Sequence, residues 1–199
     1  MKKIGILGGT FNPIHNGHLM LAKTAYKELC LDEVIFISSG ISYLKKDILM
    51  PSKEDRYEMT CLAVKDIPYF VSSDIEVKRQ GNSYTFETIL ELKEIFANAE
   101  FFYIIGADTI YNMEKWKCPE VIFNNCNIVC AVRDDIDLAQ LDLKKKEIEN
   151  KYKTSVIILN FNKINISSSE IRFLLSKNKD VSDLVPGNVL KYIAENKLY

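Results

Sequence analysis

The stretch that decides the fold is IGILGGTFNPIHNGHL, residues 4–19. Its first four residues form a short apolar run typical of a buried strand, and a helical pattern begins at Gly17. Consecutive glycines between a strand and a helix let the backbone approach a bulky anion, and the helix start supplies free N–H groups. The stretch therefore predicts a phosphate site within an α/β fold.

The glycines alone would fit a simple tight turn equally well. They fall at positions 5, 8, 9 and 17, which is not the GxGxxG spacing of a dinucleotide fold, and no Gly-Lys-Ser/Thr follows to make a P-loop. The two histidines of the chain, His15 and His18, both lie in this loop. Imidazoles there can donate hydrogen bonds to a triphosphate and to charge that develops at phosphorus. A zinc pair and a purely structural pair are the alternatives, and no third zinc-ligand motif is evident.

The rest of the chain alternates short apolar runs with amphipathic stretches, which predicts a single-domain, open, doubly wound parallel sheet of βαβ units over residues 1–199. A capping-box pattern at Ser167 and Glu170, and Pro186 in a first helical turn, predict a helical C-terminal segment that ends near Asn196. Strands are predicted at residues 4–7, 34–37, 101–105, 128–132 and 156–159, and helices at about 17–30, 52–66, 85–97 and 137–153.

Composition excludes several classes of protein. The 26 Lys and Arg nearly cancel the 27 Asp and Glu, so we expect no binding to a nucleic-acid backbone. No apolar run is long enough to span a bilayer and the start does not resemble a signal peptide, so we expect a cytoplasmic protein without membrane contact. The five cysteines include no CxxC pair, and the spacing of Cys126 and Cys130 favours small buried apolar residues over a disulfide or a zinc ribbon.

A second motif, ISSSEIR at residues 166–172, stands far along the chain from the first. Read physically, it presents hydroxyl and N–H groups at a helix start, with the guanidinium of Arg172 one turn inside. Together the two motifs resemble the HxGH and ISSTxIR signatures of a nucleotidyltransferase superfamily whose members attach AMP or CMP to phosphate-bearing acceptors. Ser169 replaces the threonine and keeps its hydroxyl.

Three more segments narrow the resemblance to the bacterial nicotinate-nucleotide adenylyltransferases, over essentially the whole chain. Residues 73–88 resemble the SxxExxxxGxSYTxDTL stretch, with Glu87 in place of its aspartate. Residues 105–116 resemble IGADxxxxxxxW, and residues 131–133 resemble a strand that ends in arginine. The resemblance implies a Rossmann-like nucleotidyltransferase fold and an enzyme of NAD biosynthesis. That enzyme joins the adenylyl group of ATP to nicotinate mononucleotide and releases pyrophosphate.

The resemblance also implies a role for individual residues. Trp116, the single tryptophan, would stack on the cationic pyridinium ring, although a lone tryptophan is more often part of a core. The Asp108 carboxylate would accept a ribose hydroxyl, although an aspartate there can also cap a helix. The expected catalytic residues are His15 and His18; the ATP-binding residues are Gly8, Gly9, Thr10, Phe11, Gly106, Asp108, Ser168, Ser169 and Arg172; and the acceptor-binding residues are Thr85, Trp116, Arg133 and Lys46.

One segment departs from the family pattern. Where the family has a proline-rich GxPPHK segment, residues 40–46 read GISYLKK, so the prolines and the histidine are missing and Lys45 or Lys46 retains the positive charge. The rival hypotheses are a transferase with another acceptor, such as nicotinamide mononucleotide, phosphopantetheine or an alcohol phosphate, and a nucleotide-binding module without catalysis. The SYT and GAD segments favour nicotinate over these acceptors, and the intact histidines and Arg172 favour catalysis.

The chemistry that follows requires few groups on the protein. The acceptor phosphate is largely a dianion at neutral pH, since its second pKa is about 6. It can attack the α-phosphorus of ATP directly, so the protein aligns the reactants and neutralises charge. We expect Mg²⁺ as the cofactor, held mainly by ATP phosphates and water, with no metal site on the protein itself. The sequence leaves open whether the chain forms a homo-oligomer.

Overall fold

The computed structural model describes residues 1–40, 50–132, 137–161 and 166–199. Its sheet has six strands in the order β3-β2-β1-β4-β5-β6, the order of a doubly wound α/β fold. The strands are β1 (Lys2–Gly9), β2 (Glu33–Ser38), β3 (Phe70–Ser73), β4 (Ala99–Gly106), β5 (Cys126–Val132) and β6 (Val156–Asn160). The predicted fold class is confirmed.

Helices occupy the stretches between the strands and the end of the chain. The predicted helices are confirmed as α1 (Asn16–Glu28), α2 (Lys53–Val64), α4 (Thr85–Ile95), α7 (Leu138–Tyr152), α8 (Ser168–Ser176) and α9 (Gly187–Glu195). The sequence patterns missed β3 and the short elements α3 (Ile75–Lys78), α5 (Ala107–Ile110), η1 (Met113–Lys115) and α6 (Pro119–Asn125). The missed helices complete no more than two turns, and the missed strand has only four residues. Such short elements show too few repeats for a period to be recognised.

Side-chain caps explain where three of the predicted helices begin. The Ser52 side chain accepts from the N–H of Asp55, Asp137 accepts from two N–H groups of the first turn of α7, and Ser167 accepts from the N–H of Glu170. Pro186 is a small correction, because it occupies the N-cap position of α9 instead of its first turn.

Among the described residues, the chain divides into two compact units. Unit 1 is Met1–Leu7, Ala22–Val34 and Tyr84–Asn162, and unit 2 is Gly8–Leu21, Ile35–Ser83 and Lys163–Tyr199. The expectation that residues 1–199 behave as one domain stays a prediction. No helix in the described part of the chain is long and apolar enough to cross a membrane.

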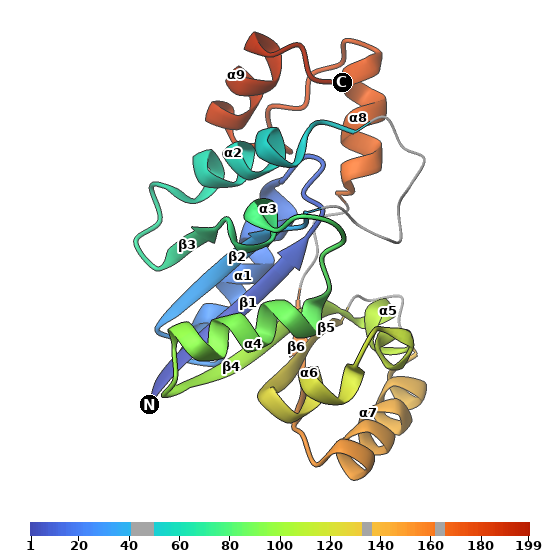
Figure 1. The fold of residues 1–199 in the computed structure, drawn as a ribbon. Coiled ribbons are helices and arrows are strands. Elements are labelled where there is room, and N and C mark those ends of the chain that lie inside the picture. The colour runs from blue at the N-terminus through green and yellow to red at the C-terminus, as the bar shows by residue number, and fades with distance from the viewer. Residues whose placement is uncertain (41–49, 133–136, 162–165) are drawn as a thin grey trace. The chain divides into compact units, whose positions relative to one another are not determined.

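Unit 1 is built on a parallel sheet of β1, β4, β5 and β6, with Ile4 of β1 opposite Phe101 of β4. Ile4, Phe101 and Ile128 are at most 1% exposed and form part of its core. Helix α6 packs against both α4 and α7 (Figure 1). Cys126 and Cys130 are buried in β5 as free thiols, as the sequence predicts.

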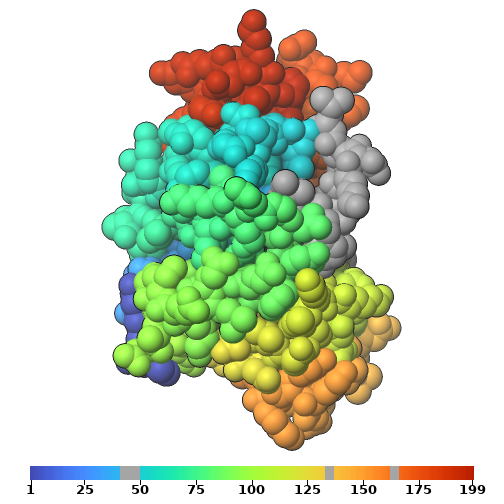
Figure 2. Space-filling view, in the orientation of Figure 1, coloured from blue at the N-terminus to red at the C-terminus, as the bar shows by residue number. Residues whose placement is uncertain are grey.

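Unit 2 holds the loop that follows β1, the helix pair α8 and α9, and α2. Helix α2 packs against β3 and α9, and the cyan atoms of α2 meet the red atoms of α9 in the space-filling view (Figure 2). The Tyr192 hydroxyl of α9 donates to the Asp55 carboxylate of α2 over 2.9 Å. Helix α8, which carries most of the second motif, belongs to the same unit as the loop of the first motif.

Gly5 tests how tightly unit 1 is packed. A Cβ added there would lie 2.8 Å from Leu31 Cδ1, 3.1 Å from Val34 Cγ2 and 3.2 Å from Ile104 Cδ1, all on buried side chains. We expect Gly5→Ala to lower the free energy of unfolding by about 1–3 kcal/mol, measured by urea denaturation, because a close-packed core resists extra volume. Gly187→Ala is the control, since nothing lies within 4 Å of its added Cβ. Equal effects of the two substitutions would contradict this explanation.

Candidate functional site

The loop between β1 and α1 shows why its glycines are needed. A Cβ on Gly9 would lie 2.7 Å from the ring of Phe11, which adopts a positive φ of 46° and is 2% exposed. Gly9 therefore makes room for a buried aromatic ring, a packing reason that the sequence did not reveal. Gly8, by contrast, is exposed at the end of β1.

The two histidines lie one against the other at the start of α1. Their rings stack with centroids 3.7 Å apart, and Gly17 leaves room for the His15 ring, which lies 3.1 Å from the position of an added Cβ. His15 is 6% exposed, whereas His18 is partly exposed. The structure thus gives the pair different positions, with His15 buried behind His18.

Hydrogen bonding fixes the orientation of His18. Its Nδ1 accepts from the backbone N–H of His15 over 3.2 Å, so the neutral imidazole carries its proton on Nε2. Burial holds the pKa of His18 well below its usual value, and the nearby His15 lowers it further. At neutral pH His18 is therefore an uncharged N–H donor.

Helix α8 brings the second motif to the first loop. The Ser168 hydroxyl donates to the Pro13 carbonyl over 2.9 Å, and Arg172 Nη1 donates to the Asn12 carbonyl over 2.8 Å. Arg172 Nη2 also donates to the Ser169 hydroxyl over 3.2 Å. Two sequence motifs about 150 residues apart thus form one site within unit 2, as predicted from the sequence.

This site encloses a cavity of about 360 Å³. Its walls combine imidazole, hydroxyl and guanidinium donors, an arrangement suited to phosphate oxygens. The lining residues are Thr10, Phe11, Asn12, His18, Met50, Ser168, Ser169 and Arg172. The predicted residues Thr10, Phe11, His18, Ser168, Ser169 and Arg172 are all among them.

Sequence reasoning missed Arg56, which supports this site from α2. Its guanidinium is 1% exposed and donates to the carbonyls of Thr10 and Ser39, each over 2.6 Å, and to that of Gly40 over 3.1 Å. Burial lowers the pKa of Arg56, but an arginine so placed stays charged. No local pattern marks it, because its acceptors lie 16 to 46 residues away.

Unit 1 holds the residues predicted to contact adenylate. Gly106 ends β4 and is the N-cap of α5, and Asp108 is exposed in the first turn of that helix. Asp108 is thus not the helix cap, and its carboxylate stands beyond the carboxyl end of a parallel strand, where α/β sheets bind ligands.

Trp116, Tyr84 and Thr85 also lie in unit 1. Trp116 is partly exposed and meets the Tyr103 ring edge to face at 6.3 Å, so it is not a core residue. The adjacent Lys117 places Nζ 4.1 Å from the ring centroid of Tyr84, the N-cap of the helix that begins with Thr85. This cation–π contact connects the two segments that were predicted to bind the acceptor.

An ion network braces the segment before Trp116. Glu114 on η1 accepts from Lys144 Nζ over 2.5 Å, from Lys151 Nζ over 2.7 Å and from the Tyr152 hydroxyl over 3.1 Å. These donors, Lys144 first, lower the pKa of Glu114 to about 2. The network fastens η1 to α7 and so limits where the indole can lie.

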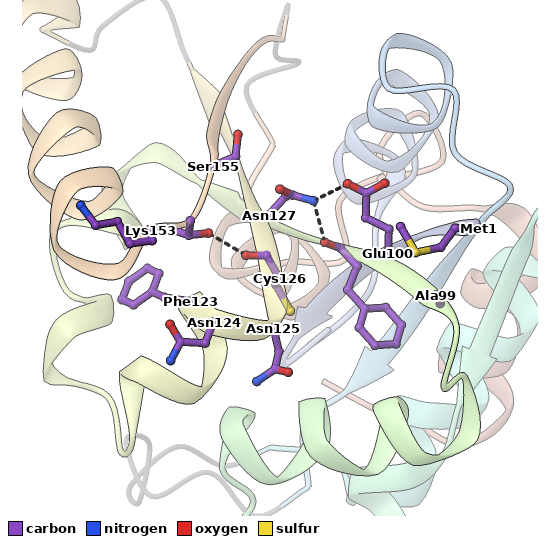
Figure 3. Close-up of a pocket in the computed structure, with 12 residues that line it drawn as sticks. Met1, Ala99, Glu100, Phe123, Asn124, Asn125, Cys126, Asn127, Lys153 and Ser155 are labelled. Atoms are coloured by element: carbon purple, nitrogen blue, oxygen red, sulfur yellow. Dashed lines mark hydrogen bonds between the residues drawn. The ribbon is translucent and has the colours of Figure 1, made fainter.

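A larger cavity, of about 450 Å³, lies at the opposite ends of β4, β5 and β6. Figure 3 shows the Asn127 amide turned toward Glu100, to which Nδ2 donates over 2.9 Å. The Thr154 hydroxyl is likewise satisfied by the Cys126 carbonyl. None of the described residues that line this cavity belongs to either of the two predicted motifs, so size alone does not identify the candidate site.

Two predicted residues, Lys46 and Arg133, lie outside the described residues, as does most of the segment that departs from the family pattern. Their roles stay predictions.

Comparison with known proteins gives consistent matches. Residues 6–173 match the family described as cytidylyltransferase-like. A Lachnoclostridium phytofermentans protein named "Probable nicotinate-nucleotide adenylyltransferase" is 39% identical over the full length of both chains, and a Clostridium tetani protein of the same name is 37% identical, also over both full lengths. The fold resembles that of Plasmodium falciparum nicotinic acid mononucleotide adenylyltransferase complexed with NaAD, with a TM-score of 0.80, 21% identity and coverage of 100% of this chain and 98% of that one.

The pKa of His18 can be measured directly, because the chain has only two histidines. In ¹³C-histidine NMR spectra we expect the His18 Cε1 signal to stay constant from pH 8 to about pH 6, since burial keeps the folded imidazole neutral while an unfolded one, with a pKa of about 6.5, takes up a proton. The folded pKa is the lower of the two, so His18 makes the fold less stable as pH falls below about 6.5. The signal is assigned with His18→Gln, and a midpoint at or above pH 6.5 would show that the site holds imidazolium.

Proposed function

Because the chain belongs to the nicotinate-nucleotide adenylyltransferase family, we propose that it transfers the adenylyl group of ATP to nicotinate mononucleotide, giving nicotinate adenine dinucleotide and pyrophosphate. The single observation that carries the proposal is identity of 39% over the full length of a protein so named. The cavity of unit 2, with its hydroxyl, imidazole and guanidinium donors, supplies the chemistry that such a reaction needs.

The unit 2 cavity binds the triphosphate of ATP in this proposal. Arg172 donates one N–H to the Asn12 carbonyl and one to the Ser169 hydroxyl. A guanidinium has five N–H donors, and the others can bind phosphate oxygens. His18 presents its Nε2–H as a preorganised donor to charge on the phosphate oxygens. An uncharged imidazole suits this role, because it holds its orientation without exchanging protons near neutral pH.

The reaction itself is a direct displacement. An oxygen of the acceptor phosphate dianion forms a bond to the α-phosphorus of ATP, and the bond from that phosphorus to the bridging oxygen breaks, so pyrophosphate leaves with the electron pair. No proton has to be removed from the nucleophile, and no covalent enzyme intermediate forms. The side chains align the two reactants and stabilise charge on the departing phosphates.

Mg²⁺ fits this site as a companion of ATP. The described residues that line the cavity include no carboxylate, the ligand that Mg²⁺ prefers in proteins. Asn12, the one amide there, accepts through its Oδ1 from the Tyr199 hydroxyl. The metal would therefore be carried by phosphate oxygens and water, and would add positive charge on the leaving group.

In unit 1, Trp116 stacks on the pyridinium ring, and Thr85 offers a hydroxyl to the nicotinate carboxylate. The Lys117 contact with Tyr84 keeps the two segments together and adds positive charge near an anionic acceptor. Gly106 and Asp108 contact the adenylate, with the carboxylate accepting a ribose hydroxyl.

We place the protein in the cytoplasm. The five free thiols support this location, since disulfides persist mainly in oxidising compartments.

A panel of acceptors tests the proposed reaction. With ATP and Mg²⁺, we expect pyrophosphate release to be fastest with nicotinate mononucleotide, and kcat/KM for the amide, nicotinamide mononucleotide, to be lower by up to ~10⁴, because a pocket built for a carboxylate leaves amide N–H groups unpaired. Phosphopantetheine and alcohol phosphates complete the panel.

His18→Ala is the catalytic control in this assay. We expect it to fold and to lose on the order of 10² to 10³ in turnover, because it lacks a preorganised donor. For the wild-type protein, equal kcat/KM values for nicotinate and nicotinamide mononucleotide would contradict the proposed specificity. If no acceptor in the panel led to pyrophosphate release, the transferase activity itself would be contradicted.

Replacing Trp116 tests the acceptor pocket. We expect Trp116→Ala to raise KM for nicotinate mononucleotide about tenfold and to leave KM for ATP nearly unchanged, because the lost stacking acts on the pyridinium ring. Trp116→Phe keeps an aromatic face and should retain most of the affinity. Steady-state kinetics with each substrate varied in turn make the comparison, and a larger change in KM for ATP would place the indole against adenine.

A further inference from the structure

Asn12 of the first motif is buried and accepts hydrogen bonds from two side chains that lie far along the chain. It is 5% exposed, and it is held at two oxygens. Its carbonyl accepts from Arg172 Nη1 over 2.8 Å, and its Oδ1 accepts from the Tyr199 hydroxyl over 2.6 Å. A buried amide oxygen needs a donor, so the position of Asn12 depends on both contacts.

Tyr199 reaches this loop from beyond α9. The end of the chain lies beside α8 in Figure 1, and the hydrogen bond joins residues 187 positions apart. Burial raises the pKa of Tyr199, so its hydroxyl is a neutral donor at physiological pH. The positive charges that partly oppose this rise come from Arg172 and Arg56, the two arginines that hold the loop carbonyls.

The same loop leads directly to the two histidines. Asn12 lines the phosphate cavity, and three residues later His15 begins the stacked pair. If Asn12 loses its donor, its side-chain amide can turn, and the loop backbone that presents the Asn12 carbonyl to Arg172 is held less firmly. Misplacement of a binding group by a fraction of an ångström is enough to weaken preorganised contacts.

We propose that Tyr199 is a positioning residue of the phosphate site. Its hydroxyl fixes Asn12 and, through Asn12, the guanidinium of Arg172 and the loop segment that leads to His15. This inference rests on the proposed function, because it assigns Tyr199 to the ATP side of that reaction.

The test compares Tyr199→Phe with Tyr192→Phe. Each variant removes one hydroxyl of one tyrosine in unit 2, but the Tyr192 hydroxyl donates to Asp55 on α2 and not to the loop. We expect Tyr199→Phe to raise KM for ATP about tenfold with KM for nicotinate mononucleotide within twofold of wild type, and Tyr192→Phe to leave both unchanged. The analogue α,β-methylene-ATP has no cleavable oxygen between its α- and β-phosphates, so it reports binding without reaction. Its affinity should fall by the same factor in Tyr199→Phe and stay unchanged in Tyr192→Phe.

A double-mutant cycle isolates the hydrogen bond. In an Asn12→Ala background the Tyr199 hydroxyl has lost its acceptor, so Tyr199→Phe should have no further effect on KM for ATP. The proposal would be overturned if Asn12→Ala and Tyr199→Phe multiplied each other's effects on KM for ATP. It would also be overturned if Tyr199→Phe raised KM for ATP and for nicotinate mononucleotide equally, because that result indicates a merely structural role.

Hydrogen exchange separates this inference from the proposed function. We expect faster amide exchange in a peptide covering residues 9–16 in Tyr199→Phe and unchanged exchange in Tyr192→Phe, whatever the activity. If the wild-type protein transferred adenylyl groups to no acceptor, the proposed function would be refuted. The exchange rates of residues 9–16 in the two variants would still test the role of Tyr199. Unchanged exchange and unchanged ATP affinity in Tyr199→Phe would refute the role of Tyr199.

Discussion

The proposed phosphate site depends on the hydrogen bonds of one buried guanidinium, that of Arg56. It reaches from α2 to the carbonyl of Thr10 in the loop after β1 and to the carbonyls of Ser39 and Gly40 in the loop after β2. Taking a cation out of water is costly, and the carbonyl dipoles gathered around it offset that cost. These contacts hold the backbone of Thr10, Ser39 and Gly40 in place, next to the cavity that Thr10 lines.

The donors of the cavity belong to a layered set of contacts in unit 2. Arg172 and Ser168 hold the next carbonyls of the same loop, and Gly9 admits the Phe11 ring, whose centroid lies 5.0 Å from that of His18. His18 thus contacts two rings, since the His15 ring also stacks on it with centroids 3.7 Å apart. Burial within this packing lowers the pKa of the imidazole and keeps it neutral at physiological pH.

Unit 1 uses a different kind of support for its share of the chemistry. The segment around Trp116 is fastened by charge, with Glu114 bound by two lysines and Lys117 resting over Tyr84. The indole itself stays partly exposed against Tyr103. The proposed phosphate site thus rests on buried hydrogen bonds, whereas the aromatic segment is held by ion pairs nearer the surface, where each pair contributes less.

The sequence by itself determined the α/β class, the five longer strands, the main helices and the two motifs that meet in the cavity, because these depend on local periodicity, caps and spacing. Only the tertiary structure decided that His15 lies behind His18, that Gly9 serves Phe11, and that Arg56, Asn12 and Tyr199 hold the loop. The physical reason is sequence distance. A hydrogen bond between residues 46 or 187 positions apart leaves no local pattern, and it exists only once the fold has brought donor and acceptor within 3 Å.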